Sequence, residues 1–314
     1  MEVAKMSQEK SMLFHVYYKQ WMKLYKKGAV RNITYQKYKQ TYKHIRKLMP
    51  EMTLGDLNRR TYQKMLNLYA ETHEKQTVLD FHHQVKSAIL DALEEGQLLI
   101  DPTRKVVIKG TVTQNHKIKY LNQQQLTKLL AQLTLEDELN WDYFILLVSK
   151  TGLRFSEALG IAPDDFDLTR LTISINKTWD YKSENEVFAM TKNRASIRKV
   201  PIDWQVAMQF AQLIKGMQKD QPIFVTPGKK IYNRTANDVL GRYCRRAGVP
   251  EISMHGLRHT HASLLLYAGV SIGSVARRLG HSNMNTTQRT YLHVIQELEN
   301  QDTDKIMRYL TTLM

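Results

Sequence analysis

The sequence contains a single cysteine, and none of its apolar runs is long enough to cross a membrane. One cysteine, Cys244, excludes an internal disulfide and any cysteine-based metal site, and it fits a reducing compartment. The first residues lack the apolar core of a signal peptide, so we expect a cytoplasmic protein. Carboxylates at metal-binding spacing are also missing, and we expect chemistry that uses neither a metal ion nor a cofactor.

Acidic residues are scarce as well: 30 Asp and Glu stand against 46 Lys and Arg, a formal net charge of +16. Residues 11–50 include no acidic side chain at all. This excess favours a polyanionic partner, and nucleic acid fits it best. A membrane surface is disfavoured because no amphipathic stretch has the strongly apolar face that such binding requires. Within this basic block, Lys37, Lys39 and Lys43 are predicted to contact DNA.

The hydrophobic pattern predicts two domains. Residues 1–110 show helical periodicity without a strand signal, which predicts an all-helical domain. Lysines lie between its aromatic residues, so we expect a small DNA-binding module. Asp101-Pro102 breaks the fourth helix, and residues 111–120 form a basic linker whose Lys117 and Lys119 are also predicted to contact DNA. The helices of this first domain are expected at 11–29, 33–48, 60–70 and 76–95.

Residues 121–314 are predicted to form a second domain that mixes helices with a few strands. Strands are expected at 171–176, where apolar and polar residues alternate, and at 186–190 and 197–202. The tryptophans at 141, 179 and 204 are interpreted as core residues. Helices are expected at 123–133, 137–150, 155–159, 204–217, 236–247, 258–267, 272–279 and 286–294.

Chemically versatile residues gather near the end of the chain. His255-Gly-Leu-Arg258 is followed by Leu279-Gly-His281 and then by Tyr291, and Arg154 lies upstream in Thr151-Gly-Leu-Arg154. Tyrosine can hold a phosphate covalently, arginine offers a planar charged fork to phosphate oxygens, and histidine exchanges protons near neutral pH. Such a set is suited to cutting a phosphodiester without a metal ion.

Together these motifs resemble the tyrosine recombinase (phage integrase) family. The likeness lies in Thr151-Gly-Leu-Arg-Phe-Ser-Glu157, His255-Gly-Leu-Arg-His-Thr260, Leu279-Gly-His-Ser282 and Thr290-Tyr291. It implies a mainly α fold with a small antiparallel β-sheet: a helical, SAM-like core-binding domain and an α+β catalytic domain. The resemblance further implies that the two domains form a C-shaped clamp around duplex DNA.

The resemblance also implies a role for each matching residue. Tyr291 matches the nucleophile, and Arg154 with Arg258 matches the pair that clamps the scissile phosphate. His255 and His281 match positions that assist phosphate binding and proton transfer, and we expect His255 to be the base that activates the tyrosine.

The family places a lysine on a β-hairpin between the two arginines, and Lys192 in Thr191–Pro201 is the best match, with Arg194 as a weaker rival. Glu157 is expected to hold Arg154 in place. The neighbouring histidines at 259 and 261 are interpreted as structural, and that at 293 as a bystander.

The segment after Tyr291 ends in an apolar stripe that is expected to pack elsewhere. In the family such a tail docks on a neighbouring protomer, so we expect a homotetramer on DNA; docking within the same chain is the alternative. The other expected partners are double-stranded DNA attachment sites and a host DNA-bending factor or an excisionase, and the protein would be nucleoid-associated. The stripe consists of Ile306, Met307, Tyr309, Leu310, Leu313 and Met314.

These features predict a site-specific recombinase that integrates or excises a mobile element through a 3′-phosphotyrosine. One alternative is an Xer-like chromosome resolvase, or an enzyme that relaxes DNA in the manner of a type IB topoisomerase. Another is a non-catalytic DNA-binding regulator on the same scaffold, which the intact set of catalytic residue types disfavours. Many integrases of mobile elements carry an additional arm-binding domain, whereas here the core-binding helices are expected to begin almost at once.

Overall fold

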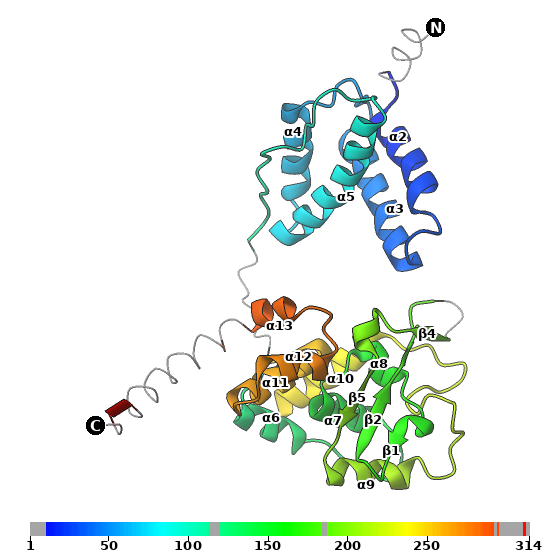
Figure 1. The fold of residues 1–314 in the computed structure, drawn as a ribbon, viewed down its shortest axis with the longest axis vertical. Helices are drawn as coiled ribbons and strands as arrows, with labels where there is room; N and C mark the ends of the chain where they lie inside the picture. The colour runs from blue at the N-terminus through cyan, green and yellow to red at the C-terminus, as the bar shows by residue number, and fades with distance from the viewer. Residues whose placement is uncertain (1–10, 113–119, 184–186, 292–293, 295–309, 312–314) are drawn as a thin grey trace. The chain divides into compact units, whose positions relative to one another are not determined.

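The computed structural model describes residues 11–112, 120–183, 187–291, 294 and 310–311. The chain divides into two compact units, 1–116 and 117–314 (Figure 1). Each unit has its own hydrophobic core. The architecture is mainly helical with small antiparallel sheets, which confirms the predicted fold class. Among the described helices, none has the length and apolar character needed to span a membrane.

The first unit is helical, as its periodicity predicted. Aromatic side chains fill its core, with Phe14, Tyr18 and Tyr62 fully buried. A segment after the last helix lies along α4, where Gln63 exchanges two hydrogen bonds with the backbone of Val107, both 2.8 Å long. The helices are α2 (Phe14–Trp21), which continues as a π-helical turn at Met22–Lys26, α3 (Asn32–Leu48), α4 (Arg59–Ala70) and α5 (Lys75–Glu94).

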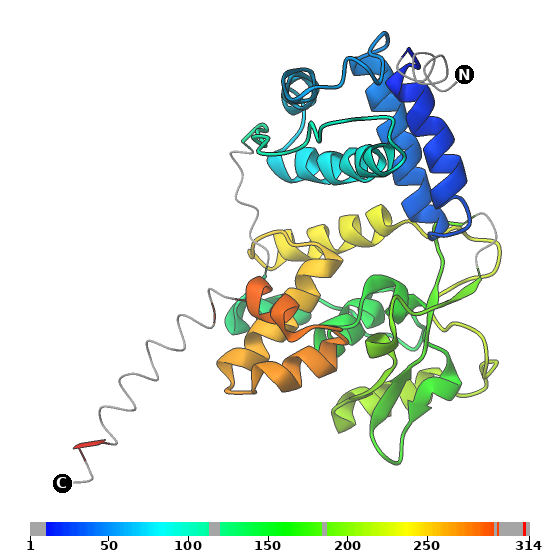
Figure 2. The same ribbon diagram turned by 45° about the horizontal axis from the view of Figure 1, so that its top comes forward.

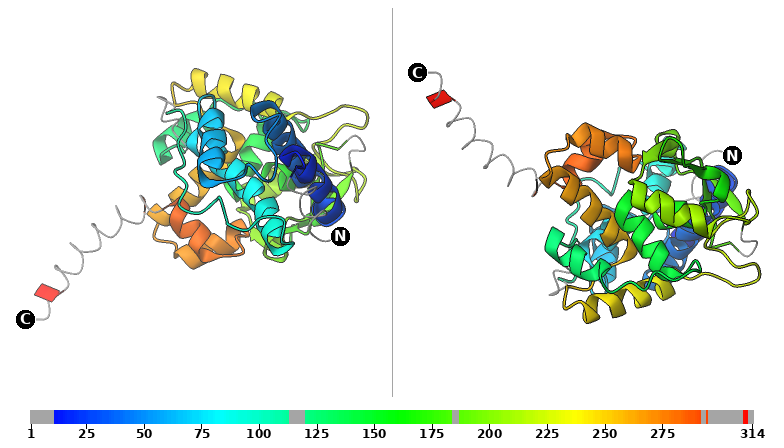
Figure 3. Two further views of the ribbon diagram at one scale, coloured as in Figure 1. Left: turned by 90° about the horizontal axis from the view of Figure 1, so that it is seen from above. Right: turned by 90° about the horizontal axis from the view of Figure 1, so that it is seen from below.

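The second unit surrounds one central helix, α7, nearly all of whose side chains are buried. This helix packs against α11. Figures 2 and 3 show α11, α12 and α13 (orange) on one side of the unit and the strands (green) on the other. The helices are α6 (Gln123–Leu130), α7 (Trp141–Thr151), α8 (Phe155–Leu159), α9 (Trp204–Leu213), α10 (Asn233–Arg246), α11 (Met254–Tyr267), α12 (Ile272–Leu279) and α13 (Met284–Thr290).

The strands form one long, interrupted hairpin. Strands β2 and β3 form its outgoing arm, and β4 and β5 form its returning arm, with Ile175 opposite Arg198 and Lys177 opposite Met190. Between these two pairs, Asn176 on the outgoing arm lies opposite seven residues on the returning arm. We call these seven residues, 191–197, the bulge. The strands are β1 (Phe166–Asp167), which pairs with β2, then β2 (Thr172–Ile175), β3 (Lys177–Trp179), β4 (Phe188–Met190) and β5 (Arg198–Pro201).

Two expectations need correction. The strands on either side of Lys192 do not pair with each other, because β4 pairs with β3 and β5 pairs with β2. Trp204 is not a core residue: it is 64% exposed, since it is the first residue of α9 after the capping Asp203. By contrast, Trp179 is buried, and Trp141 packs against the core.

Candidate active site

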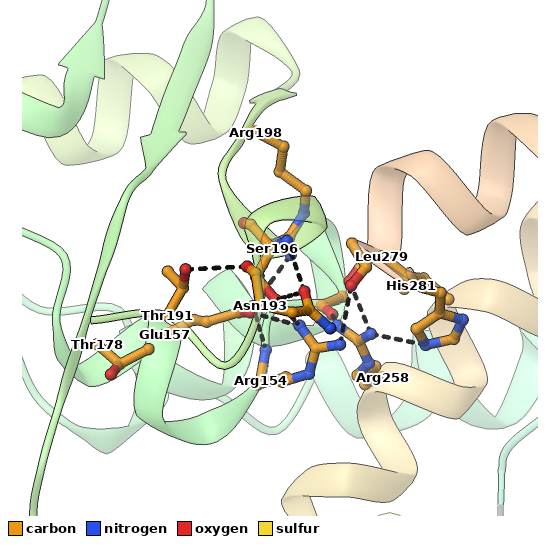
Figure 4. Close-up of polar contacts among 12 residues, drawn as sticks. Arg154, Glu157, Thr178, Thr191, Asn193, Ser196, Arg198, Arg258, Leu279 and His281 are labelled. Atoms are coloured by element: carbon orange, nitrogen blue, oxygen red, sulfur yellow. Dashed lines mark hydrogen bonds and ion pairs between the residues drawn. The ribbon is translucent and has the colours of Figure 1, made fainter. Parts of the chain in front are cut away.

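Two arginines from distant parts of the sequence meet at the C-terminus of α12. Arg154 stands just before α8, and its Nη2 donates to the carbonyl of Gly280 at 3.0 Å. Arg258 lies on α11 and is only 2% exposed; its Nη2 donates to the carbonyl of Leu279 at 2.8 Å. Figure 4 shows both guanidinium groups beside this end of the helix. The carbonyls at a helix C-terminus carry partial negative charge, so they favour cations there.

Glycines with left-handed backbone shape both sides of this meeting point. Gly152 (φ 69°) ends α7, and its carbonyl accepts from Arg258 Nη1 at 2.7 Å. Gly280 (φ 67°) ends α12, and a Cβ at this position would approach Arg198 Nη1 to 2.8 Å. Residues other than glycine pay a steric penalty for such backbone, so these turns depend on glycine.

A third arginine and a buried carboxylate hold the cluster together. Arg198 on β5 donates from Nε to the carbonyl of Arg278 at 2.6 Å and from Nη2 to Glu157 at 3.0 Å. Glu157, 1% exposed, also accepts from Arg154 Nη1 at 2.5 Å. Burial alone would raise the pKa of Glu157, but Arg198 and then Arg154 hold it below its ordinary value. Among the described contacts, two guanidiniums thus share one carboxylate, and Arg258 lies beside them at the end of α12. Three cations with one anion favour binding a further anion.

The bulge that carries Lys192 is attached to this cluster. Ser196 accepts a hydrogen bond from Arg154 Nη1 at 3.3 Å, and its own backbone N–H and hydroxyl donate to Asn193 Oδ1 (Figure 4). The side chain of Lys192 is exposed, as is that of Arg194. The bulge is therefore tied to the arginine cluster through Ser196, and it leaves the side chain of Lys192, four residues earlier, accessible from solvent.

His281 is held in one tautomer. Its Nε2 lies 2.9 Å from Arg258 Nη2 and its Nδ1 lies 2.7 Å from Thr287 Oγ1. Burial, followed by the charge of Arg258, lowers the pKa of His281 to about 4. The ring is therefore neutral at pH 7, accepts from the guanidinium through Nε2 and donates from Nδ1 to the threonine hydroxyl.

Tyr291 follows α13 and is 2% exposed. Its ring packs in an apolar cluster with Leu266, Val275 and Leu279. The hydroxyl lies 2.9 Å from Nδ1 of His259, one residue after Arg258. Burial raises the pKa of Tyr291 to about 12, although the charge of Arg258 acts in the opposite direction. The phenol is thus protonated at neutral pH and needs a base before it can attack.

His255 is the residue that the sequence predicts to activate Tyr291, but no contact between these two side chains is found among the described residues. It is exposed at the start of α11, and its ring contacts that of His259 edge-on, with centroids 4.6 Å apart. Enclosure by the surrounding protein, then Arg258 and Arg154, lowers the pKa of His255. Sequence reasoning missed the contact of His259 with the tyrosine, although His255 and His259, four apart on a helix, share a face.

The remaining histidine of this helix has structural contacts. Nδ1 of His261 lies 2.9 Å from the carbonyl of Ser149, and its Nε2 accepts from Arg278 Nε at 2.8 Å. Burial, followed by the charge of Arg278, lowers the pKa of His261 to about 3. These contacts fasten α11 to α7 and to α12.

The predicted DNA contacts lie partly outside the described residues. Lys37, Lys39 and Lys43 are exposed on α3, whereas Lys117, Lys119, the histidine at 293 and nearly all of the apolar tail fall outside the described part. Sequence reasoning overlooked a groove of about 680 Å³ along α4 in the first unit. Within the described residues, no group of three His, Cys, Asp or Glu could hold a metal ion. The basic residues of the groove are Arg59, Arg60, Lys64, Lys105 and Lys109.

Comparison with known proteins identifies the family. A model described as the phage integrase family matches residues 119–297. The integrase of Staphylococcus phage L54a is 23% identical over 332 residues, covering 96% of this chain and 94% of that integrase. The ICEBs1 integrase of Bacillus subtilis (strain 168) is 27% identical over 205 residues, 60% of this chain and 54% of that protein.

Solved structures share the fold. The Tn1549 transposon integrase in complex with a circular intermediate DNA has a TM-score of 0.75 at 17% identity, covering 89% of this chain and 95% of that one. The lambda integrase dimer bound to a COC′ core site has a TM-score of 0.65 at 15% identity, with coverage of 91% and 79%. The chain belongs to the phage integrase family, and it is therefore a tyrosine recombinase, an enzyme of site-specific DNA recombination.

Proposed function

We propose that this recombinase is an integrase that moves a genetic element by cutting and rejoining DNA through a covalent 3′-phosphotyrosine. One observation carries the proposal: the guanidiniums of Arg154 and Arg258 meet at the end of α12, and the hydroxyl of Tyr291 lies 2.9 Å from His259, the residue that follows Arg258. Similarity to integrases of a phage and of the element ICEBs1 supports the link to mobile DNA.

In the proposed reaction the scissile phosphate binds between Arg154, Arg258 and His281. The oxygen of Tyr291 bonds to phosphorus while the bond to the 5′ oxygen breaks, and the 3′ phosphate stays on the enzyme. Negative charge grows on the nonbridging oxygens during this step, and fixed guanidiniums stabilise it more in the transition state than in the ground state. Attack by another 5′ hydroxyl reverses the chemistry and rejoins the strand without ATP.

The leaving oxygen needs a proton, and we assign that role to Lys192. Its side chain is exposed on the bulge 191–197, which Ser196 ties to Arg154. An ammonium group can donate a proton, whereas the guanidinium of Arg194 holds its proton too tightly to serve.

The proposed partner is a double-stranded DNA attachment site, contacted by both units. The exposed Lys37, Lys39 and Lys43, together with Lys117 and Lys119, are proposed to bind its backbone. Phosphate contacts of this kind make affinity depend steeply on salt.

Assembly is part of the proposal. The lambda integrase has been solved as a tetramer bound to a Holliday junction, with a TM-score of 0.62 to this chain. We propose that this protein likewise forms a homotetramer on DNA through its apolar tail, and that a host bending factor or an excisionase sets the direction of the reaction.

A chromosome resolvase is the second candidate, because XerC of Bifidobacterium longum (strain DJO10A) is 33% identical over 172 residues, which cover 54% of this chain. An integrase exchanges strands between two different sites, whereas a resolvase acts on two copies of one site. Strand exchange on paired duplexes therefore separates the two, and relaxation of supercoiled DNA without exchange would indicate a topoisomerase.

The proposal can be tested with duplexes that the protein selects from a random-sequence pool. Nicked derivatives of a selected duplex lose a short fragment on cleavage, so they trap the covalent intermediate. We expect a denaturant-resistant adduct with the unaltered protein, and none with Tyr291→Phe, which should still bind the duplex. An adduct that persists in Tyr291→Phe would contradict the assignment.

A further inference from the structure

One face of α11 presents an array of ionisable groups that leads outward from the buried tyrosine. His255, Arg258 and His259 are spaced i, i+3 and i+4, so they share this face. Tyr291 is 2% exposed, His259 is half-buried and His255 is exposed. The tyrosine hydroxyl lies 2.9 Å from His259 Nδ1, and the rings of the two histidines touch edge-on with centroids 4.6 Å apart.

We propose that His259, rather than His255, takes the phenolic proton when Tyr291 attacks the phosphate. This proposal rests on the proposed function and names a residue beyond it. As the bond between the tyrosine oxygen and phosphorus forms, the phenolic proton moves to His259 Nδ1. The bond to the 5′ oxygen breaks, and that oxygen takes a proton from Lys192. In the reverse reaction each proton returns to its origin.

The contacts around His259 support this role. An acceptor has to lie within about 2.6–3.2 Å of the proton's oxygen, and His259 meets this condition before DNA binds. The hydroxyl donates to Nδ1 when the imidazole carries its own proton on Nε2. No contact between His255 and the tyrosine hydroxyl is found among the described residues. His255 contacts His259 from the outer side instead, on the path toward solvent.

Other ionisable groups also face this array, so a pH profile needs matched variants. His255 and Arg258 share α11 with His259, Tyr291 follows α13, and His281, which contacts Arg258, lies in the turn before α13. The effect of His259 is therefore best separated by replacing one histidine at a time with the same residue. Asparagine suits this purpose, because its side-chain oxygen can accept the phenolic hydrogen bond but cannot take the proton.

The experiment measures the rate of adduct formation in a single turnover on the trapping duplex described above. A second duplex carries sulfur in place of the bridging 5′ oxygen, because a thiolate leaves without needing a proton. We expect His259→Asn to slow adduct formation on both duplexes by roughly 100-fold, a typical contribution of a general base. Lys192→Ala should slow adduct formation only on the duplex with the ordinary bridging oxygen. DNA binding and thermal unfolding of His259→Asn should match those of the unaltered protein.

The pH dependence provides the second readout. The unaltered protein and His255→Asn should both lose rate toward acidic pH as the base becomes protonated, and His259→Asn should lose this acidic limb. The inference is overturned if His259→Asn forms the adduct at a rate within about threefold of the unaltered protein, or if its rate still falls toward acidic pH. It is also overturned if this variant is slow only on the duplex with the ordinary bridging oxygen. Failure of the unaltered protein to form any adduct would instead contradict the proposed function itself.

Discussion

Replacing Glu157 with glutamine tests the charge network that positions Arg154. The carboxylate is 1% exposed and bonds Arg154 and Arg198 at 2.5 and 3.0 Å, so the change leaves two arginines without their anion. Removing one partner from a buried ion pair typically costs about 3–5 kcal/mol. We expect a loss of this size in the free energy of unfolding, measured by urea denaturation.

Glu251→Gln is the matched control. Glu251 bonds Arg245 at 2.8 Å, but both side chains are more than half exposed, so this pair should contribute only about 0–1 kcal/mol. Glu157→Gln should also slow adduct formation at least about tenfold, because Arg154 loses its support, whereas Glu251→Gln should react normally. The reasoning is refuted if the two variants unfold at the same urea concentration.

The remaining predictions concern backbone, pH and salt. Gly280→Ala should lower the free energy of unfolding, measured by urea denaturation, by roughly 2 kcal/mol or more, because the new Cβ would approach Arg198 to 2.8 Å in left-handed backbone. Gly216→Ala is the control: its backbone is also left-handed but the space around it is open, so the loss should be only about 1 kcal/mol. Folding lowers the pKa of His261 from 6.5 to about 3. Between pH 6.5 and pH 3 this histidine is therefore protonated in the unfolded chain but neutral in the folded protein. Stability should therefore be complete above pH 6.5 and fall by up to about 5 kcal/mol as the pH drops through this window, and urea denaturation that is independent of pH there would contradict it. Replacing Lys39 with alanine should lower the slope of log affinity against log salt by about 1 without changing which duplex is preferred, and an unchanged slope would remove that lysine from the DNA contacts.

Much of the fold could be predicted from the sequence, because local periodicity and glycines mark its helices. The boundaries were less accurate, since side-chain caps decide them. Ser253 caps α11 by accepting from the N–H of Gly256, so the helix begins at Met254, four residues before the predicted start. Asn140 likewise sets the start of α7 at Trp141. The first of these shifts places His255 inside the helix and on the same face as His259.

The site could be predicted only as a set of residue types. That Arg154 reaches the carbonyl of Gly280, 126 positions away, depends on how α8 and α12 pack, and no local pattern records it. The same holds for Arg198, whose contacts with Glu157 and with the end of α12 follow from the pairing of β2 with β5. The contact between His259 and Tyr291 depends in the same way on tertiary packing.

The most direct test of the account is to identify the amino acid that becomes joined to DNA. The trapped adduct would be digested with protease and nuclease, and the modified peptide sequenced by mass spectrometry. The account predicts a nucleotide attached through its 3′ phosphate to Tyr291. A nucleotide on any other residue, or one attached through its 5′ phosphate, would contradict it.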